Sequence, residues 1–487
     1  MFRVIFSVIT IVVLLSATNV FGSTIYVPKD FPTIQQAITA SLDGDMILVD
    51  PGTYRSICYD GKKVTVKSNK GPSVTILDGH FSGAVVRFTN NEGQDSVLEG
   101  FTITNGSGEL IGSDVYGGGV YCRGSSPIIR NNIIAGNSVE GCGAGIACCD
   151  KSSPTIVKND IRDNFAGWGA GIYCRDYSSP LINSNNITGN VAAVWGGGIE
   201  CIYYSDLLII NNIISGNSAE YGGGIYVYRI VLPTITNNTI CNNSAVWYGG
   251  GIMCMGTSCD LTVTNTILWD NVAAKGKEVY LGSPPTYPSS LHISYSDVDG
   301  GKSSVHIDPQ STLAWGPGMI DADPIFVNSD AADFHLTWGS PCGNAAVETD
   351  PNLPSDDFEG DPRVAWGGVD MGADEFYTHL YHRGMVVPGG EVDIVLTGWP
   401  NMSTTVGRGS AVVEFPVSTC YGDLYLAAPI IKFYPGRIPA NGVLVAPKTI
   451  PLSCIVGQEY PYQALAGALG WPNTELTNLM LLTVQAN

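Results

Sequence analysis

Positively charged side chains are scarce in this chain. Of its 487 residues, 24 are Lys or Arg and 44 are Asp or Glu, so the formal net charge is −20. Binding to nucleic acid depends on a concentrated basic surface, and this charge balance argues against nucleic acid as a partner. It also repels an acidic polysaccharide, unless a metal ion or a local group of arginines offsets the field.

Long apolar runs are absent after the first 22 residues. Residues 4–17 form an apolar run behind Arg3, and Val20, Phe21 and Gly22 follow it, which is the pattern of a cleaved signal peptide. An uncleaved membrane anchor is the alternative, but the apolar run is short for a bilayer span. We therefore expect a secreted or cell-surface protein with no transmembrane span after cleavage.

Motifs for zinc and nucleotide binding are missing as well. The six histidines form no His-x-x-x-His or Glu-x-x-His pair, so a zinc site has no support. The glycine-rich runs lead into predicted strands and not into helices, which argues against a phosphate loop or a dinucleotide fingerprint. The remaining signals are structural repeats.

Glycine, by contrast, is abundant and recurs in register. A Gly-Gly-Gly-Ile signal or a close variant occurs six times, in steps of 26, 26, 27, 26 and 27 residues. The six copies end at Val120, Ile146, Ile172, Ile199, Ile225 and Ile252. A fixed period of this length is typical of a solenoid, in which each unit buries its apolar face only by stacking on its neighbours.

Asparagine repeats with the same period. One set stands two residues before an isoleucine: Asn131, Asn159, Asn185, Asn211, Asn238 and Asn265. A second set follows five or six positions later: Asn137, Asn164, Asn190, Asn217, Asn243 and Asn271. Asn tolerates left-handed backbone, and its amide can bond to the same amide one coil away, so both sets predict ladders. With a further short strand after residues such as Pro127 and Pro154, each coil has three predicted strands, which indicates a parallel β-helix.

Thirteen cysteines in an exported chain ordinarily suggest disulfides. Five of them, however, lie two residues after the repeat's Val or Ile: Cys122, Cys148, Cys174, Cys201 and Cys254. Residues two apart on a strand share a face, so we expect a buried stack of thiols that acts as small apolar residues. A disulfide between coils is the alternative, since coils about 4.8 Å apart permit one. Cys420 and Cys454 are the expected disulfide of the C-terminal region.

The ends of the repeat region carry a family resemblance. Residues 32–41 predict a short amphipathic cap helix, and the run Ile25-Tyr26-Val27 to Ile76-Leu77-Asp78-Gly79 resembles the opening of secreted bacterial right-handed parallel β-helix proteins of the pectin-lyase-like superfamily. Residues 323–376 resemble the closing segment of those proteins, and the repeats also resemble those of chlamydial polymorphic outer-membrane proteins. The resemblance spans residues 24–376. It implies an all-β, right-handed fold and export, and says little about activity.

Three regions follow from these patterns. Residues 1–22 are the predicted signal peptide, and residues 23–376 are the predicted β-helix, a single-stranded solenoid of 26–27-residue coils with an N-terminal cap helix. From residue 377 the glycine repeat stops, and short apolar runs alternate with Gly, Pro and Asn turns. We expect residues 377–487 to form a separate all-β module resembling a small sandwich.

Strand parity predicts which side chains of each coil face solvent. The column one residue after the inward Ile holds Tyr121, Ala147, Tyr173, Glu200, Tyr226 and Met253, and the column three residues after it holds Arg123, Cys149, Arg175, Ile202, Tyr228 and Met255. A third column, four residues before the Ile, holds Tyr116, Cys142, Trp168, Trp195, Tyr221 and Tyr248. Aromatic residues at coil spacing can form a platform for sugar rings, or can merely pack over the glycine corners. The predicted substrate-binding residues are Trp168, Trp195, Tyr221, Tyr248, Tyr121, Tyr226 and Arg123.

The best catalytic group that the sequence offers is Tyr173, Arg175 and Glu200 on neighbouring coils. An Arg or Tyr base suits β-elimination from a uronic acid sugar, and paired carboxylates suit glycoside hydrolysis. Solvated surface groups are the alternative interpretation. No group of three aspartates on successive coils, as in hydrolases of this superfamily, accompanies them.

Acidic residues near the end of the solenoid are candidates for calcium, which prefers hard oxygen ligands. They are Asp321, Asp323, Asp356, Asp357, Glu359 and Asp361. Solvated loops are the alternative here.

Three functions remain open at this stage: an exported protein that binds polysaccharide along the solenoid, a polysaccharide lyase or glycoside hydrolase, and a structural or adhesion protein of the cell surface. The absence of a recognisable catalytic motif favours the first.

Overall fold

The structure is a computed structural model. It describes residues 22–229, 232–256, 259–282, 288–337, 339–364 and 368–376, and beyond these the backbone of strands between residues 380 and 483. The predicted signal peptide lies outside the described residues, apart from Gly22. Among the described residues, the helices are too short or too polar to span a bilayer.

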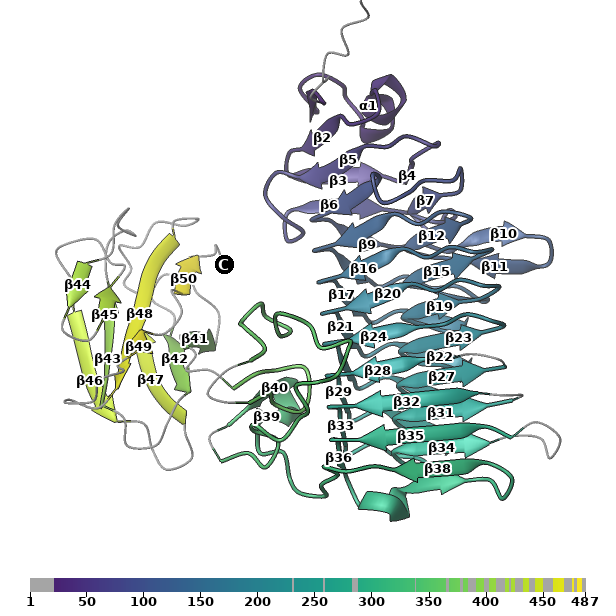
Figure 1. The fold of residues 1–487 in the computed structure, drawn as a ribbon. Coiled ribbons are helices and arrows are strands. Elements are labelled where there is room, and N and C mark those ends of the chain that lie inside the picture. Colours follow the sequence, from purple (N-terminus) through teal and green to yellow (C-terminus); the bar gives the residue numbers. More distant parts are fainter. Residues whose placement is uncertain are drawn as a thin grey trace, which may run out of the picture.

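The N-terminal end is closed by a strand and a short helix, at the top of Figure 1. Strand β1 (Thr24–Val27) precedes helix α1 (Ile34–Ala40), whose N-cap Thr33 accepts a hydrogen bond from the backbone N–H of Gln36. The helix buries Ile34, Ala37 and Ile38 against the first coils. This confirms the cap helix predicted for residues 32–41, and it covers the edge that an open solenoid would expose.

The chain then winds into coils whose strands stack in three parallel sheets (Figure 1). The β1 sheet contains β1, β2 (Met46–Val49), β5 (Thr65–Ser68), β8 (Val97–Glu99), β13 (Ile128–Arg130), β16 (Thr155–Val157), β20 (Leu181–Asn183), β24 (Leu208–Ile210), β28 (Thr234–Thr236), β32 (Asp260–Thr264), β35 (Ser290–Ser294) and β38 (Thr312–Trp315). The β3 sheet contains β3 (Gly52–Arg55), β6 (Thr75–Asp78), β9 (Thr102–Thr104), β14 (Ile133–Ala135), β17 (Asp160–Arg162), β21 (Asn186–Thr188), β25 (Ile213–Ser215), β29 (Thr239–Cys241), β33 (Ile267–Trp269) and β36 (Asp297–Val298). The β4 sheet contains β4 (Ile57–Cys58), β7 (Val86–Phe88), β12 (Val120–Arg123), β15 (Ile146–Cys149), β19 (Ile172–Cys174), β23 (Ile199–Ile202), β27 (Ile225–Tyr228), β31 (Ile252–Met255), β34 (Val279–Gly282) and β37 (Val305–Ile307). The predicted parallel β-helix is therefore confirmed.

The core is a set of columns of apolar side chains inside the coils. The repeat residues Ile146, Ile172 and Ile199 stack in register along the β4 sheet and are fully buried. The five predicted inward cysteines are fully buried as well, and four of them, Cys122, Cys148, Cys174 and Cys201, are free, which confirms the thiol stack at these positions. Cys254 forms a disulfide with Cys259 of the same coil, a pairing that the sequence did not indicate. The predicted pair Cys420 and Cys454 lies outside the described residues.

Two asparagine ladders run along the solenoid. In the second, every amide predicted from the sequence bonds to the next, with Nδ2···Oδ1 distances of 2.9–3.0 Å from Asn137 to Asn271. In the first ladder, three positions predicted from the sequence are wrong. Asn132 and Asn212 form the ladder in place of Asn131 and Asn211, and Thr266 stands at the place predicted for Asn265. Asn131, Asn211 and Asn265 instead adopt left-handed turns, with φ of 55°, 56° and 52°. Adjacent turn and ladder positions both suit Asn, so the sequence alone could not separate them.

A fourth, shorter sheet was not predicted. It contains β18 (Phe165–Trp168), β22 (Val191–Trp195), β26 (Ser218–Tyr221) and β30 (Ser244–Tyr248), between the β3 and β4 sheets. One earlier coil extends at the same place into an antiparallel hairpin of β10 (Glu109–Ile111) and β11 (Asp114–Tyr116), which projects from the column in Figure 1. Both elements lie beside the outer face of the β4 sheet.

The chain that follows the last coil folds back along the solenoid. After 3-10 helix η1 (Gly301–Ser304), the strands β39 (Phe326–Asn328) and β40 (Asp333–Leu336) pair on either side of η2 (Ser329–Ala331), and the chain then runs over the β3 sheet (Figure 1). We call residues 321–376 the closing segment. The guanidinium of Arg363, which is fully buried, holds it there: Nη2 donates to Asn211 Oδ1 at 2.5 Å and to the carbonyls of Gly372 and Ala373.

Beyond the closing segment the described backbone consists of antiparallel strands. They are β41 (Leu380–Arg383), β42 (Glu391–Thr397), β43 (Ser403–Arg408), β44 (Val417–Thr419), β45 (Gly422–Leu424), β46 (Lys432–Arg437), β47 (Val443–Thr449), β48 (Glu459–Gly467), β49 (Glu475–Leu476) and β50 (Met480–Thr483). Their side chains lie outside the described residues, so the sandwich resemblance of this module stays a prediction.

Candidate functional site

The outer face of the β4 sheet carries a buried aromatic layer. The column predicted to face solvent, from Tyr121 through Tyr173 and Tyr226 to Met253, points away from the core as expected, but these side chains are all buried. The prediction of solvent exposure is therefore wrong for this column. Strand parity places a side chain outside the coil, but it does not reveal what covers that outside face.

The third column provides the cover. Its aromatic rings pack against the first column: the Trp195 ring stacks on Tyr226 with centroids 5.9 Å apart, and the Tyr248 ring stacks at 4.5 Å on Tyr280, the register partner of Met253 on the next coil. Trp168 and Tyr221 are partly buried in the same cluster, while Trp195 is 37% exposed. These contacts favour the packing alternative for most of the third column, because a ring that is covered on one face by its own layer has little area left for a sugar.

The predicted catalytic residues do not meet in an open cleft. Tyr173 and Glu200 are register partners on β19 and β23, and both lie beneath the aromatic layer. Arg175 is partly buried at the rim, where Nε donates to Asp176 at 2.6 Å and Nη1 donates to the Tyr116 hydroxyl at 2.6 Å. Contact between a polymer and Glu200 would first require the rings above it to move.

Glu200 is the unusual member of this group. It is 2% exposed among aromatic neighbours, and its Oε2 has no hydrogen-bond partner among the described residues. Burial raises the pKa of its carboxyl well above the ordinary value, because an apolar layer disfavours the charged form. Glu200 is therefore a buried acid in surroundings that favour its protonated form.

An open groove lies beside the projecting hairpin. It has a volume of about 460 Å³ and is lined by Arg87, Thr89, Glu109, Ile111, Tyr121, Arg123, Gly124 and Asp150. The lining comes from strands β7, β12 and β10 and from the corner after β15. Two predicted substrate-binding residues, Tyr121 and Arg123, therefore meet at this groove with Asp150.

Two ion pairs form the walls of the groove. Arg87 Nη1 donates to Glu109 Oε1 at 2.9 Å, and Arg123 Nε donates to Asp150 Oδ2 at 2.6 Å. All four side chains are partly exposed, so their remaining donors and lone pairs face solvent. Burial raises the pKa of the Tyr121 hydroxyl, which keeps it protonated in the floor of the groove. The groove thus offers guanidinium donors and carboxylate acceptors above the buried Tyr121.

An exposed tyrosine pair continues the same corner of the solenoid. Tyr177 and Tyr204 are 57% and 45% exposed, and their rings lie nearly parallel, with centroids 5.0 Å apart. Both have left-handed backbone, with φ of 63° and 62°, as does Lys151 at the equivalent place beside the groove, with φ of 67°. Left-handed backbone at bulky residues costs free energy, and residues with such strained backbone cluster at functional sites. Strand parity does not predict this pair, because both tyrosines lie at corners and not on strands.

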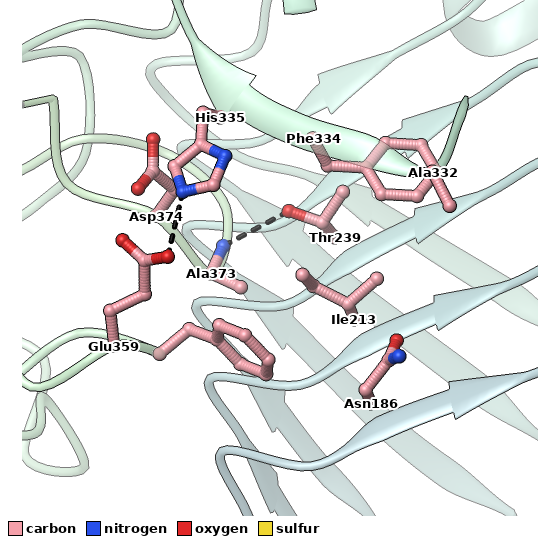
Figure 2. Close-up of a pocket in the computed structure, with 10 residues that line it drawn as sticks. Asn186, Ile213, Thr239, Ala332, Phe334, His335, Glu359, Ala373 and Asp374 are labelled. Atoms are coloured by element: carbon pink, nitrogen blue, oxygen red, sulfur yellow. Dashed lines mark hydrogen bonds and ion pairs between the residues drawn. The ribbon is translucent and has the colours of Figure 1, made fainter. Parts of the chain in front are cut away.

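A second, smaller cavity lies under the closing segment. It has a volume of about 150 Å³, and its walls come from β21, β25 and β29 on one side and from the closing segment on the other (Figure 2). Its lining residues are Asn186, Ile213, Thr239, Ala332, Phe334, His335, Phe358, Glu359, Ala373 and Asp374. The titratable groups His335, Glu359 and Asp374 gather at one end of the cavity, whereas the polar residues Asn186 and Thr239 lie on the side of the coils.

Acidic side chains surround His335. Its Nδ1 lies 2.5 Å from Asp333 Oδ1 and its Nε2 lies 2.7 Å from Glu359 Oε1. Burial opposes the charged imidazole, but the hydrogen bonds to the two carboxylates outweigh it and raise the pKa of His335 well above its ordinary value. Asp374, also in this group, accepts a hydrogen bond from the Leu336 backbone N–H at 2.8 Å through Oδ2.

The structure brings together only part of the predicted calcium group. Asp357, Glu359 and Asp361 approach one another, with potential ligand atoms within 4.8 Å. However, Asp357 Oδ1 already accepts the backbone N–H groups of residues 359–361, and Oδ2 accepts that of Glu375, so this carboxylate closes a turn. Asp321 and Asp323 likewise accept from nearby backbone N–H groups. Calcium binding by these residues stays a prediction.

Sequence comparison agrees with the architecture. A family model described as a right-handed beta helix region matches residues 55–228 and 194–314, which together cover more than half of the chain. No curated protein matches the chain.

Proposed function

Because the chain belongs to the right-handed β-helix family, we propose that it is an exported or cell-surface protein whose solenoid binds polysaccharide at the groove formed by Arg87, Glu109, Tyr121, Arg123 and Asp150. The observation that carries the proposal is the convergence of two arginine–carboxylate pairs over a tyrosine floor in an open groove. Sugar hydroxyls accept hydrogen bonds from guanidinium groups and donate to carboxylates, and sugar faces pack on exposed aromatic rings such as those of Tyr177 and Tyr204 further along the solenoid.

The shape of the solenoid suits a polymer. Successive coils repeat the same corner, so the groove on β12 and β15 is followed along the column by the exposed pair Tyr177 and Tyr204. A chain of sugar rings lying along this corner would meet the groove first and the tyrosine pair next. The two arginines balance the two carboxylates of the groove, so the charged groups of its lining carry no excess negative charge on a chain of net charge −20.

Binding is tested with the purified protein on an array of plant, bacterial and animal polysaccharides, followed by calorimetry on the best ligand. We expect Arg123→Ala and Arg87→Ala each to weaken binding at least about tenfold, as is common for the loss of a charged hydrogen bond. The matched control is Arg162→Ala on the β3 sheet, since Arg162 forms similar surface pairs with Asp160 and Asp163.

The outcome also separates the two alternatives. Release of oligosaccharides from the bound polymer would support a lyase or a hydrolase. The absence of binding to every polysaccharide would contradict the proposal and favour a structural or adhesion role. Equal losses in Arg123→Ala and Arg162→Ala would show that general surface charge, and not the groove, recognises the ligand.

A further inference from the structure

The closing segment buries more negative than positive charge. Asp357, Asp370, Asp374 and Glu375 are each at most 7% exposed, and the fully buried Arg363 is the cation among them, with Nη1 3.7 Å from Glu375. A buried carboxylate without an opposite charge either keeps its proton or acquires a cation. This excess of buried acid is continuous with the partly exposed Asp333 and Glu359 at the rim of the small cavity.

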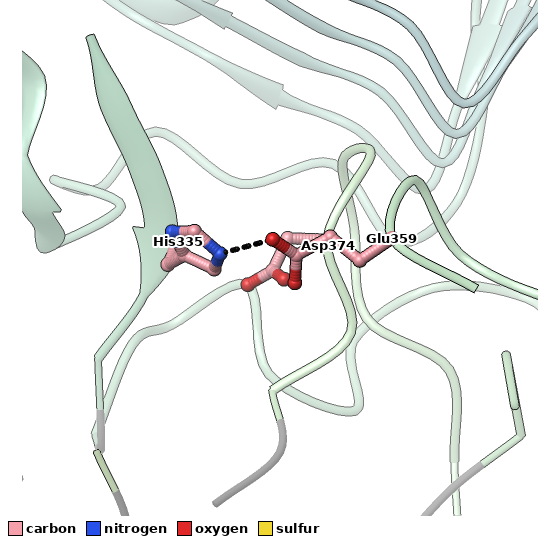
Figure 3. Close-up of side chains that lie close together, drawn as sticks. All are labelled: His335, Glu359 and Asp374. Carbon is pink, nitrogen blue, oxygen red and sulfur yellow. Dashed lines mark hydrogen bonds and ion pairs between the residues drawn. The ribbon is translucent and has the colours of Figure 1, made fainter. Parts of the chain in front are cut away.

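One carboxylate oxygen in this group faces the cavity without a partner. Asp374 is 7% exposed, and while its Oδ2 accepts from Leu336, its Oδ1 is buried and has no hydrogen-bond partner among the described residues. Its ligand atoms lie within 4.8 Å of those of His335 and Glu359. Figure 3 shows the two carboxyl groups gathered at one ring nitrogen of His335. An unpartnered buried acceptor is costly, and a bound cation would satisfy it.

The histidine is oriented as a metal ligand would be. The contact of Nδ1 with Asp333 Oδ1 sets Nε2 toward Glu359 and Asp374. A histidine that binds a metal typically donates its other ring N–H to a carboxylate, which fixes the ring and makes the binding nitrogen more basic. Asp333 therefore corresponds to the carboxylate that orients the histidine, and Glu359 and Asp374 correspond to the other two metal ligands.

We propose that His335, Glu359 and Asp374 bind a divalent transition-metal ion, with Zn²⁺ as the best-fitting ion, beneath the closing segment. One imidazole nitrogen and two carboxylate oxygens form a three-ligand set that leaves further positions for water from the adjoining cavity. Calcium fits less well, because it takes six to eight oxygen ligands, whereas imidazole suits zinc and its neighbours. Binding would also add positive charge where the segment holds excess acid, and so would fasten it to the coils.

The site is tested on the full chain after dialysis against a chelator. Calorimetric titration with ZnCl₂ is expected to show one specific equivalent per chain and a raised thermal midpoint, since a ligand that binds only the folded state stabilises it. CaCl₂ and MgCl₂ are expected to bind at least about tenfold more weakly. Substitution with Co²⁺ provides a spectroscopic readout of a low-coordinate site.

Three variants and one matched control decide the assignment. His335→Gln, Asp374→Asn and Glu359→Gln are each expected to weaken Zn²⁺ binding at least about tenfold. Glu359 is exposed, so its variant tests the site even if a buried substitution unfolds the segment. His292→Gln is the control, because His292 faces Asp260 at 3.4 Å on the surface of the solenoid. Absence of Zn²⁺ binding by the wild type, or equal binding by wild type and Glu359→Gln, would overturn the proposal and leave a histidine–carboxylate cluster without metal.

Discussion

The side-chain amide of Asn190 donates to Oδ1 of Asn217, one coil further on, at 3.0 Å, and also to the Ile161 carbonyl at 2.8 Å. Its own Oδ1 accepts from both the backbone and the side chain of Asn164. Asn190 therefore links three coils. Because it is fully buried, water cannot replace any of these bonds.

Replacement of this residue by alanine should be strongly destabilising. In Asn190→Ala, the backbone N–H and a side-chain N–H of Asn164 lose their acceptor and the Ile161 carbonyl loses a donor, while Asn217 Oδ1 keeps only the Asn190 backbone N–H. Each orphaned group costs about 1–3 kcal/mol. We expect a loss of at least about 3 kcal/mol in the free energy of unfolding, measured with denaturant. Asn69→Ala is the control, since Asn69 is exposed, its side chain bonds to Asp50, and alanine retains its backbone bond to the Val49 carbonyl. A similar small effect in both variants would contradict the ladder's role.

The middle glycine of a repeat has no room for a side chain. A Cβ at Gly223 would lie 2.5 Å from the Ser244 carbonyl oxygen and 2.7 Å from that of Gly250. Gly223→Val should therefore push the next coil away and lower the thermal midpoint, with a cost of about 1–3 kcal/mol or more. Gly93→Ala is the comparison, because a Cβ there meets nothing within 4 Å. Unchanged melting of Gly223→Val would refute this packing.

Glu200 should make stability depend on pH. Burial raises its pKa in the folded state, so the folded chain retains a proton that the unfolded chain releases above pH about 4.5. Its stabilising contribution is present below that pH and is lost as pH rises toward the folded pKa, by up to about 1.4 kcal/mol per pH unit. Glu200→Gln, which does not titrate, should match the wild type near pH 4.5 and exceed its stability at pH 8.

Urea unfolding of both proteins at pH 4.5, 6 and 8 measures this difference. Glu220→Gln is the control, because Glu220 is exposed on β26 and should show no such divergence. A constant difference between Glu200→Gln and wild type at all three pH values would mean that Glu200 is ionised in the folded protein.

Arg363 should hold the closing segment on the solenoid. Loss of one partner of a buried ion pair leaves the other charges uncompensated and costs about 3–5 kcal/mol. In Arg363→Met, we expect faster proteolysis within residues 321–376 while the coils resist, because the neighbours of Arg363 lie in that segment and on Asn211. Arg162→Met, at the surface, should be cleaved like wild type. Faster cleavage inside the coils instead would show that the segment does not open separately.

Local chemistry made much of the scaffold predictable. Three features interact only within one coil and with the next coil: glycine at a corner that excludes a Cβ, apolar residues at inward positions, and asparagine at coil spacing. Each coil therefore has the same requirements, and the period can be read from the sequence. The ambiguous cases were also local: at Asn131 and Asn132, or Asn211 and Asn212, two adjacent asparagines suit both a left-handed turn and a ladder.

The candidate sites were less predictable, because they depend on what lies above a strand and not on the strand itself. Tyr121 and Arg123 were identified, but the groove exists only because the β10–β11 hairpin carries Glu109 to Arg87. Strand parity predicts a solvent-facing Glu200, as a catalytic residue or a solvated surface group, yet Glu200 is buried under the aromatic layer of the β4 sheet.

By itself, the sequence determined the period, the inward columns, the cap helix and the parallel β-helix, because these follow from steric and hydrophobic rules that repeat every 26–27 residues. Tertiary structure alone decided which outward side chains are buried and how residues distant in sequence meet. His335, Glu359 and Asp374 come from three separate stretches of the closing segment, and they approach one another only because that segment folds back on the coils and excludes water from its acidic side chains.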